Sequence, residues 1–228
     1  MWDIDGTLIV NTPTAGSLYL DAVEQVTGVR PTVRLGNSHG MTEGQLLAGI
    51  LEVNDIEALH LAAVYERIEE LSLLEHEAGH TREACEGAAE ALAAFAARGW
   101  INALLTGNGP NRARYKVLAA GYDAGAFDWQ HSYFGHESPT RHHLTSDARL
   151  DLEGEHAIII GDTPKDGEAA DSAGIPFVAV ATGSFAADEL RGTNAIVVIE
   201  DFVTGLGEAT DAIVSAIAQS NGLASARR

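Results

Sequence analysis

The sequence predicts an α/β protein, in which helices cover both faces of a parallel sheet and a small helical domain is inserted after the first strand. From Trp100 onward, short apolar runs alternate with helix-like stretches, which is typical of repeated strand-helix units on a parallel sheet. Residues 12–81 instead carry apolar residues at helical spacing and show no strand signal. The composition is 46% hydrophobic but only 6% aromatic, which suits aliphatic helices packed on a sheet.

The strands and helices of the main domain can be placed from their apolar runs and end signals. We expect strands at 100–105, 132–134, 156–160, 177–181 and 195–199, with helices at 110–120, 140–150, 164–173 and 205–218 between and after them. Pro110 and Pro164 fall where a first helical turn accepts proline, and Gly121 and Gly174 fall where a helix ends.

The inserted segment contains two sets of apolar residues at helical spacing. They are Leu46, Leu47, Ile50 and Leu51, followed by Leu61, Val64, Ile68 and Leu71. Such stripes predict amphipathic helices that pack on each other. We therefore expect a core domain formed by residues 1–11 and 82–228, and a helical cap formed by residues 12–81.

The charge and cysteine content limit the partners that the protein can have. A net charge of −19 argues against nucleic acid and anionic membranes, because binding to either requires Lys and Arg. The single cysteine, Cys85, excludes an intramolecular disulfide. The first residues do not form a secretory signal, and no apolar run approaches membrane-spanning length. We expect a cytoplasmic monomer or homodimer.

Four aspartates follow strands or candidate strands. Asp3 and Asp5 lie in Asp3-Ile4-Asp5-Gly6-Thr7, and Asp162 and Asp166 lie in Asp162-Thr163-Pro164-Lys165-Asp166. The carboxyl ends of parallel strands meet at one edge of the sheet, so these carboxylates should converge there and repel one another unless a cation offsets them. Oxygen ligands with no nearby His or Cys indicate Mg²⁺.

A third motif, Thr106-Gly107-Asn108, follows the strand expected at 100–105. Thr106 offers a hydroxyl, and the turn before the Pro110 helix can direct backbone N–H groups at an anion. Carboxylates, a hard cation and an anion-binding turn together favour phosphoryl transfer.

With these motifs in this order, the chain resembles the haloacid dehalogenase (HAD) superfamily over nearly its whole length, and in particular its phosphoglycolate-phosphatase-like branch. The resemblance implies a Rossmann-like core with a helical cap and a small phosphorylated metabolite as substrate. It implies that Asp3 is the nucleophile, that Asp5 is the general acid and base with a raised pKa, and that Thr106 binds phosphate, where we expect the turn at Gly107 and Asn108 to bind it as well. It also implies that Mg²⁺ is held by Asp3, the backbone carbonyl of Asp5 and Asp162, with Asp166 ordering its surroundings.

The sequence departs from this family pattern at the lysine expected between the second and fourth motifs. Arg141 is the best match for its place, and Lys116, one helix earlier, is the rival. An arginine can chelate phosphate but cannot lose its proton, which suits an electrostatic role. We expect Arg141 to bind phosphate.

A second departure concerns the residues before the nucleophile. The family's first strand has several apolar residues there, whereas this sequence has Met1 and Trp2. We expect the native chain to extend upstream of Met1, and a longer form to be more stable.

Three other functions remain open. A sugar-phosphate mutase of the same superfamily would share Asp3 and Asp5. The segment His76-Glu77-Ala78-Gly79-His80 fits the short zinc-protease pattern, although Gly79 weakens the helix that this pattern requires. A catalytically silent binding protein would have little need of both aspartates.

Substrate choice should lie in the insert, near Arg34, His39 and Thr42.

Overall fold

The computed structural model describes residues 1–12, 16–36 and 38–226. Its strands are β1 (Leu105–Thr106), β2 (Tyr133–Phe134), β3 (Ile159–Gly161), β4 (Phe177–Val180) and β5 (Ala195–Ile199). Its α-helices are α1 (Ser17–Thr27), α2 (Glu43–Val53), α3 (Leu61–Glu77), α4 (Ala88–Ala96), α5 (Pro110–Ala119), α6 (Arg141–Asp151), α7 (Pro164–Ala173), α8 (Ala187–Leu190) and α9 (Phe202–Ala226), with short 3-10 turns at Ala58–His60 and Ala124–Ala126. No helix in these ranges is both long and apolar enough to span a membrane.

The sheet is parallel throughout, as the sequence predicts. β1 pairs with β2, and β3, β4 and β5 pair in that order. Trp2 joins the two groups, because it forms parallel bridges with both Leu104 and Ile160. The strand expected at 100–105 is shorter than predicted, since parallel pairing begins only where Trp2 lies beside it. The N-terminal segment is therefore the centre of the sheet.

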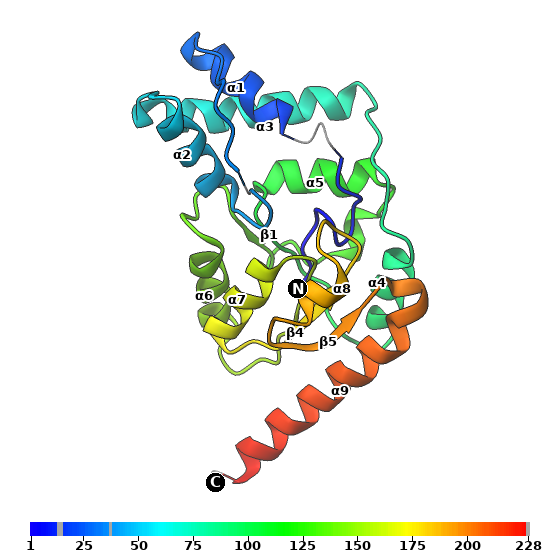
Figure 1. The fold of residues 1–228 in the computed structure, drawn as a ribbon. Coiled ribbons are helices and arrows are strands. Elements are labelled where there is room, and N and C mark those ends of the chain that lie inside the picture. Colours follow the sequence, from blue (N-terminus) through cyan, green and yellow to red (C-terminus); the bar gives the residue numbers. More distant parts are fainter. Residues whose placement is uncertain (13–15, 37, 227–228) are drawn as a thin grey trace.

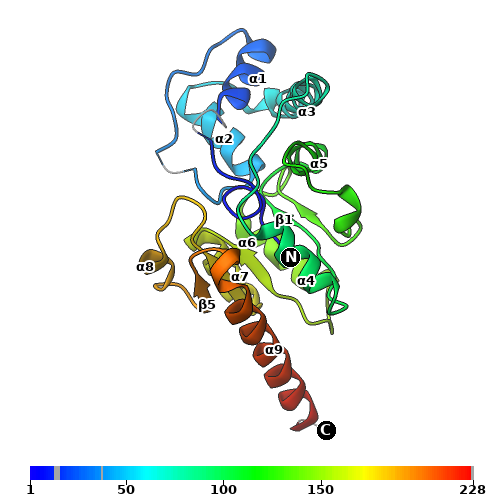
Figure 2. The ribbon, with the colours of Figure 1, turned by 90° about the vertical axis from the view of Figure 1, so that its right-hand side faces the viewer.

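Helices cover both faces of this sheet (Figures 1 and 2). The apolar cluster on one face contains residues of α4, α5 and α9, including Phe95, Val117 and Ile213. The cluster on the other face contains residues of α6, α7 and α8, including Leu144 and Ala170. The expected α/β class is confirmed. Helix α9 is longer than the predicted 205–218, and its C-terminal part projects beyond the body in both views.

Helices α1, α2 and α3 form a separate apolar cluster at one end of the molecule. Leu47, Val64 and Ile68 are fully buried in it, as their spacing predicts. Helix α1 was not expected from the sequence, although Tyr19, Leu20 and Val23 complete the same cluster.

The start of α2 docks onto the loops that follow β1 and β2. The backbone N–H of Glu43 donates to the carbonyl of Gly107 at 2.7 Å, and that of Gly44 donates to Gly135 at 3.0 Å. The Thr42 hydroxyl, which caps α2, donates to the carbonyl of Ser138 at 2.6 Å. The first turn of α2 therefore lies directly on the core.

This contact leaves no room for a side chain at position 44. A Cβ atom on Gly44 would lie 2.8 Å from the carbonyl oxygen of Ser138 and 3.0 Å from that of His136. Gly44→Ala should lower the free energy of unfolding by about 1–3 kcal/mol, measured by urea denaturation. The control is Gly207→Ala in α9, where a Cβ meets nothing within 4 Å, and where alanine should raise stability by about 0.5–1 kcal/mol. Equal effects of the two changes would contradict the docking.

Candidate active site

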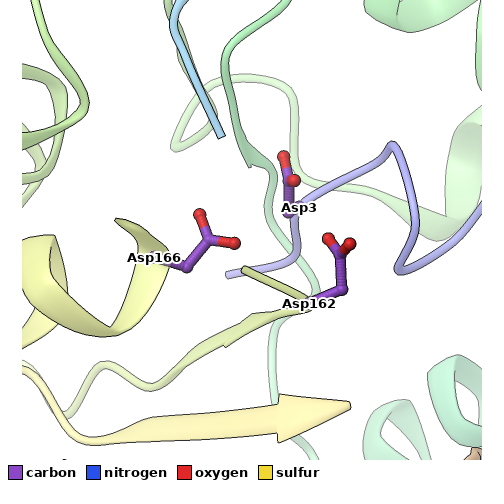
Figure 3. Close-up of side chains that lie close together, drawn as sticks. All are labelled: Asp3, Asp162 and Asp166. Atoms are coloured by element: carbon purple, nitrogen blue, oxygen red, sulfur yellow. The ribbon is translucent and has the colours of Figure 1, made fainter. Parts of the chain in front are cut away.

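Three buried carboxylates meet at the carboxyl end of the central strands (Figure 3). Asp3 follows Trp2, Asp162 follows β3, and Asp166 lies in the first turn of α7. One oxygen from each lies within 4.8 Å of the others. The expected convergence of these three aspartates occurs because each follows or faces the end of a parallel strand.

The cluster is electrostatically strained without a cation. Burial, together with the charges of Asp166 and Asp5, raises the pKa of Asp3 to about 6, although Arg141 opposes the shift. Burial and the charges of Asp166 and Asp3 raise the pKa of Asp162 well above its usual range. Among the described residues, the buried Asp162 Oδ2 has no hydrogen-bond partner. An unsatisfied buried carboxylate oxygen beside two further carboxylates fits a hard cation such as Mg²⁺.

Asp166 uses its two oxygens differently. Oδ2 accepts hydrogen bonds from the backbone N–H of Thr163 at 3.1 Å and from its hydroxyl at 2.8 Å, which completes a capping box at the start of α7. Oδ1 lies 2.7 Å from Arg141 Nη2. Asp166 therefore both caps the helix and faces the carboxylate cluster.

Arg141 is the cation next to the expected nucleophile. It is the first residue of α6, with Thr140 as its N-cap, and its side chain is only 3% exposed. Its Nη2 lies 3.3 Å from Asp3 Oδ1 and donates to the carbonyl of Leu105 at 2.9 Å. The structure thus brings Arg141, rather than Lys116, to Asp3.

Lys116 instead holds Asp5. Its Nζ donates to both carboxylate oxygens of Asp5, at 2.7 and 2.6 Å, and Asn108 Nδ2 donates to one of them at 2.8 Å. Burial alone would raise the pKa of Asp5, but these two partners lower it to about 2. The expectation of a raised pKa at Asp5 is therefore wrong for this arrangement, because Lys116 stabilises the ionised form.

The turn after β1 connects the Lys116–Asp5 pair to the three buried carboxylates. Thr106 is fully buried, and its hydroxyl accepts from Asn108 Nδ2 at 2.8 Å. Gly107 lies under the cap, because a Cβ there would be 2.4 Å from the carbonyl oxygen of Met41. The N–H of Gly109, at the start of α5, donates to Glu43 Oε2 at 3.0 Å, so a cap carboxylate occupies that donor.

A buried polar cluster between cap and core was not predicted from the sequence. The carboxylate of Glu43 accepts from the Tyr19 hydroxyl at 3.0 Å, and its Oε1 lies 3.6 Å from Arg112 Nε. The Arg112 guanidinium lies over the Tyr19 ring, 5.1 Å from its centroid. Only the spacing of Arg112 and Lys116, four residues apart on one face of α5, could have indicated this arrangement.

A cleft of about 380 Å³ opens above the carboxylates. Asp3, Asp162 and Arg141 line its core side, and Arg34 and His39 line its cap side. The expected cap residues Arg34 and His39 thus reach the cleft. Thr42 is instead a buried residue that forms the N-cap of helix α2.

The candidate zinc motif does not have the geometry of a zinc-binding helix. Helix α3 ends at Glu77, and Gly79 takes a φ of +71°, so His80 lies outside the helix that carries His76. The ring of His76 stacks on Tyr115, with the centroids 4.9 Å apart. Within the described residues, the metal-binding cluster of three or more side chains contains neither histidine.

Comparisons with solved structures define the class of fold. The chain is similar to a HAD hydrolase of family IA, variant 3, from Entamoeba histolytica (20% identity, 93% of this chain and 97% of that chain, TM-score 0.67). It is similar to a HAD family hydrolase from Deinococcus radiodurans with bound phosphate and sodium (20%, 92% and 94%, 0.55). It is also similar to CbbY from Rhodobacter sphaeroides, a mutant in complex with xylulose-1,5-bisphosphate (19%, 89% and 93%, 0.61). The chain therefore has the fold of cap-containing HAD hydrolases.

Sequence comparison points to the same group over a shorter stretch. Residues 139–205, which include Arg141, Asp162 and Asp166, match the family described as HAD-hydrolase-like. No curated protein sequence matches the chain.

Metal binding should stabilise the protein through Asp162. At a Mg²⁺ concentration a hundred times the dissociation constant, the wild type should gain about 2.7 kcal/mol of stability, measured by thermal denaturation in Mg²⁺ and in EDTA. Asp162→Asn should lose this gain and should be more stable than the wild type in EDTA, because it removes a buried like charge. The control is Asp147→Asn, which changes an exposed aspartate in α6.

The stability difference between the wild type and Asp162→Asn should also depend on pH, in the direction set by the raised pKa values of Asp3 and Asp162. Protons on Asp3 and Asp162 stabilise the native state below the ordinary pKa of 3.8, and for Asp3 this contribution is lost as the pH rises through about 6. In EDTA, the stability of the wild type relative to Asp162→Asn should therefore fall as the pH rises from 4 to 7. A stability difference between the two proteins that stays constant with pH would contradict the electrostatic strain assigned to Asp3 and Asp162.

Proposed function

We propose that the protein is a Mg²⁺-dependent phosphatase of the HAD superfamily, which hydrolyses a small phosphate monoester through a phospho-aspartate at Asp3. The observation that carries the proposal is the position of the Asp3 carboxylate, which lies at the floor of a cleft between the cation Arg141 and two further buried carboxylates. Similar folds with bound phosphate and with a bound sugar bisphosphate support this class of substrate.

In the first step, an oxygen of Asp3 attacks phosphorus, and the bond between phosphorus and the leaving alcohol oxygen breaks. Arg141 orients Asp3 and offers its guanidinium to the transferring phosphoryl group. The hydroxyl of Thr106 and the backbone of Gly107 and Asn108 bind the same group. Mg²⁺, held by Asp3, Asp162 and the backbone carbonyl of Asp5, with Asp166 beside them, would neutralise charge on the phosphoryl oxygens.

In the second step, Asp5 acts as a base and takes a proton from the water that hydrolyses the aspartyl phosphate. Beside Lys116 its carboxylate is already ionised, as a base must be, and it becomes a stronger base when it parts from Lys116. Protonation of the leaving alcohol in the first step requires that Asp5 part from Lys116 and stay buried, because an aspartate with its ordinary pKa of about 4 is ionised at neutral pH and only burial raises the pKa of Asp5.

The cap helices and the core divide the work in this proposal. Residues 12–81 would form the cap, whose residues Arg34 and His39 line the cleft and would face the leaving group, and residues 1–11 and 82–228 would form the catalytic core. Phosphoglycolate is the first substrate to test, because the sequence most resembles that branch of the superfamily.

Phosphate release tests the proposal. The wild type should release phosphate from an aryl phosphate, and from some member of a panel of phosphoglycolate and sugar phosphates, in Mg²⁺ but not in EDTA. Asp3→Asn should lower kcat by at least about 10³-fold, whereas Asp147→Asn should leave it unchanged. Release that persists in Asp3→Asn, or that needs no divalent cation, would refute the proposed chemistry.

Arg141 should contribute to catalysis and to stability through the charge and the planar shape of its guanidinium group. Arg141→Met should lower kcat/KM for the aryl phosphate by about 10²–10³-fold, and it should destabilise the fold by about 3–5 kcal/mol, because Asp3 and Asp166 lose a buried partner. Arg141→Lys should fall between this variant and the wild type. Arg149→Met changes an exposed arginine in the same helix and should have no effect. A kcat/KM unchanged in Arg141→Met would remove Arg141 from the site.

Lys116 should set the pH range in which Asp5 works as a base. Because Lys116 lowers the pKa of Asp5 to about 2, kcat of the wild type for the aryl phosphate should stay level down to low pH wherever the protein remains folded, provided that Mg²⁺ is saturating and so keeps Asp3 ionised. In Lys116→Met the decline of kcat on the acid side should begin at higher pH, whereas Lys116→Arg should resemble the wild type. Identical pH profiles of kcat in wild type and Lys116→Met would show that Lys116 does not act on Asp5.

A further inference from the structure

Arg112 is a buried cation that the proposed chemistry does not use. It lies on α5, one helical turn before Lys116, and only 2% of its surface is exposed. It nevertheless lines the cleft, together with Tyr19 of α1 and Glu43 of α2. A charge that is buried to this extent is costly unless it has partners. The partners of Arg112 therefore decide what else it can bind.

The contacts within the protein leave hydrogen-bonding capacity on Arg112, whose guanidinium has five N–H donors. Nη1 donates to Ser72 Oγ at 3.3 Å, but the buried Nε has no hydrogen-bond partner among the described residues. Glu43 is the nearby carboxylate, and the 3.6 Å between its Oε1 and Nε is longer than a hydrogen bond. Both oxygens of Glu43 already accept hydrogen bonds elsewhere, from the Tyr19 hydroxyl and from the N–H of Gly109, each at 3.0 Å. Glu43 therefore offsets charge without saturating the guanidinium.

The buried ring of Tyr19 holds the guanidinium by its face. The Cζ atom of Arg112 lies 5.1 Å from the centroid of this ring. The N–H donors of a guanidinium lie around its edge, so contact through the face does not use them. Arg112 is thus an oriented group with donors suited to a carboxylate or a phosphate.

Arg112 lies on the side of the cleft that would hold the alcohol part of the substrate. The next turn of α5 carries Lys116, whose Nζ lies 2.7 and 2.6 Å from the two carboxylate oxygens of Asp5. Residues four apart on a helix share a face, so Arg112 and Lys116 flank the same part of the cleft. A phosphate monoester with its phosphorus at Asp3 and its leaving oxygen at Asp5 would direct the rest of the alcohol toward Arg112.

We propose that Arg112 determines substrate specificity by binding a second anionic group, a carboxylate or a phosphate, on the alcohol part of the phosphate monoester. This inference rests on the proposed phosphatase function and deepens it. The role falls to a buried residue of α5, whereas Arg34 and His39, which line the same cleft, are exposed residues between α1 and α2. A buried, oriented guanidinium discriminates sharply, because a substrate without the second anion leaves its donors unpaired.

Binding can be measured without turnover in Asp3→Asn, which lacks the proposed nucleophile. The matched ligands are phosphoglycolate, which has a carboxylate, ethylene glycol bisphosphate, which has a second phosphate, and 2-hydroxyethyl phosphate, which has neither. Calorimetry in Mg²⁺ should show that at least one of the first two binds about 10–10²-fold more tightly than the third. Arg112→Met in this background should abolish the preference, defined as this ratio of dissociation constants, and Arg112→Lys should retain part of it.

Two control variants separate binding from folding. Arg114→Met makes the same change at an exposed position of α5 and should leave the preference intact. Glu43→Gln keeps the shape of the side chain but removes the negative charge beside Arg112, so it should raise the preference by about threefold or more. Because the preference compares two ligands in one protein, a smaller folded fraction in Arg112→Met does not alter it.

Three results would overturn the proposal. Equal binding of the three ligands would show that the cleft does not recognise a second anion. A preference that survives Arg112→Met, or that is lost in Arg34→Met instead, would place the second anion elsewhere in the cleft. A preference that does not rise in Glu43→Gln would show that Glu43 and the ligand do not share Arg112. Phosphate release from the aryl phosphate by the wild type tests the phosphatase chemistry separately, so either proposal can fail alone.

Discussion

The active-site end of the structure depends on a balance between the mutual repulsion of three buried carboxylates and the attraction of the buried Arg141 guanidinium, which offsets part of that repulsion. Asp3, Asp162 and Asp166 are brought together by the parallel sheet, and Arg141 reaches two of them from the start of α6. Charges at this density in a low-dielectric site are stable only with compensating cations. Burial, together with the charges of neighbouring carboxylates, raises the pKa values of Asp3 and Asp162, and a bound cation would oppose both shifts.

A second set of charges lies on the cap side, and there each of two carboxylates has a cation as its partner. Lys116 and Asn108 hold Asp5 in its ionised form, while Arg112, one helical turn earlier on α5, meets Glu43 and Tyr19 of the cap. One helix of the core thus contacts both the expected general base and the start of α2.

Much of the fold was predictable because its signals are local. Helix α7 matches its expected range, since Pro164 and Gly174 mark its ends, and the aspartates converge because parallel strands end at one edge. Other features depend on contacts that are distant in sequence. The pairing of Lys116 with Asp5 spans 111 residues, and the position of Glu43 depends on how the cap docks. No local sequence pattern identifies these partners.

The most direct test of the central claim is to isolate the covalent intermediate. Asp5→Asn lacks the base for the second step, and an aryl phosphate needs no acid for the first, so mixing the two in Mg²⁺ and quenching in acid should trap the phosphorylated enzyme. Peptide mapping by mass spectrometry should then find one phosphoryl group on the peptide that contains Asp3, and none when Asp3 is also replaced by Asn. An unmodified Asp3, or a phosphoryl group on another residue, in protein that still binds Mg²⁺ would contradict the account.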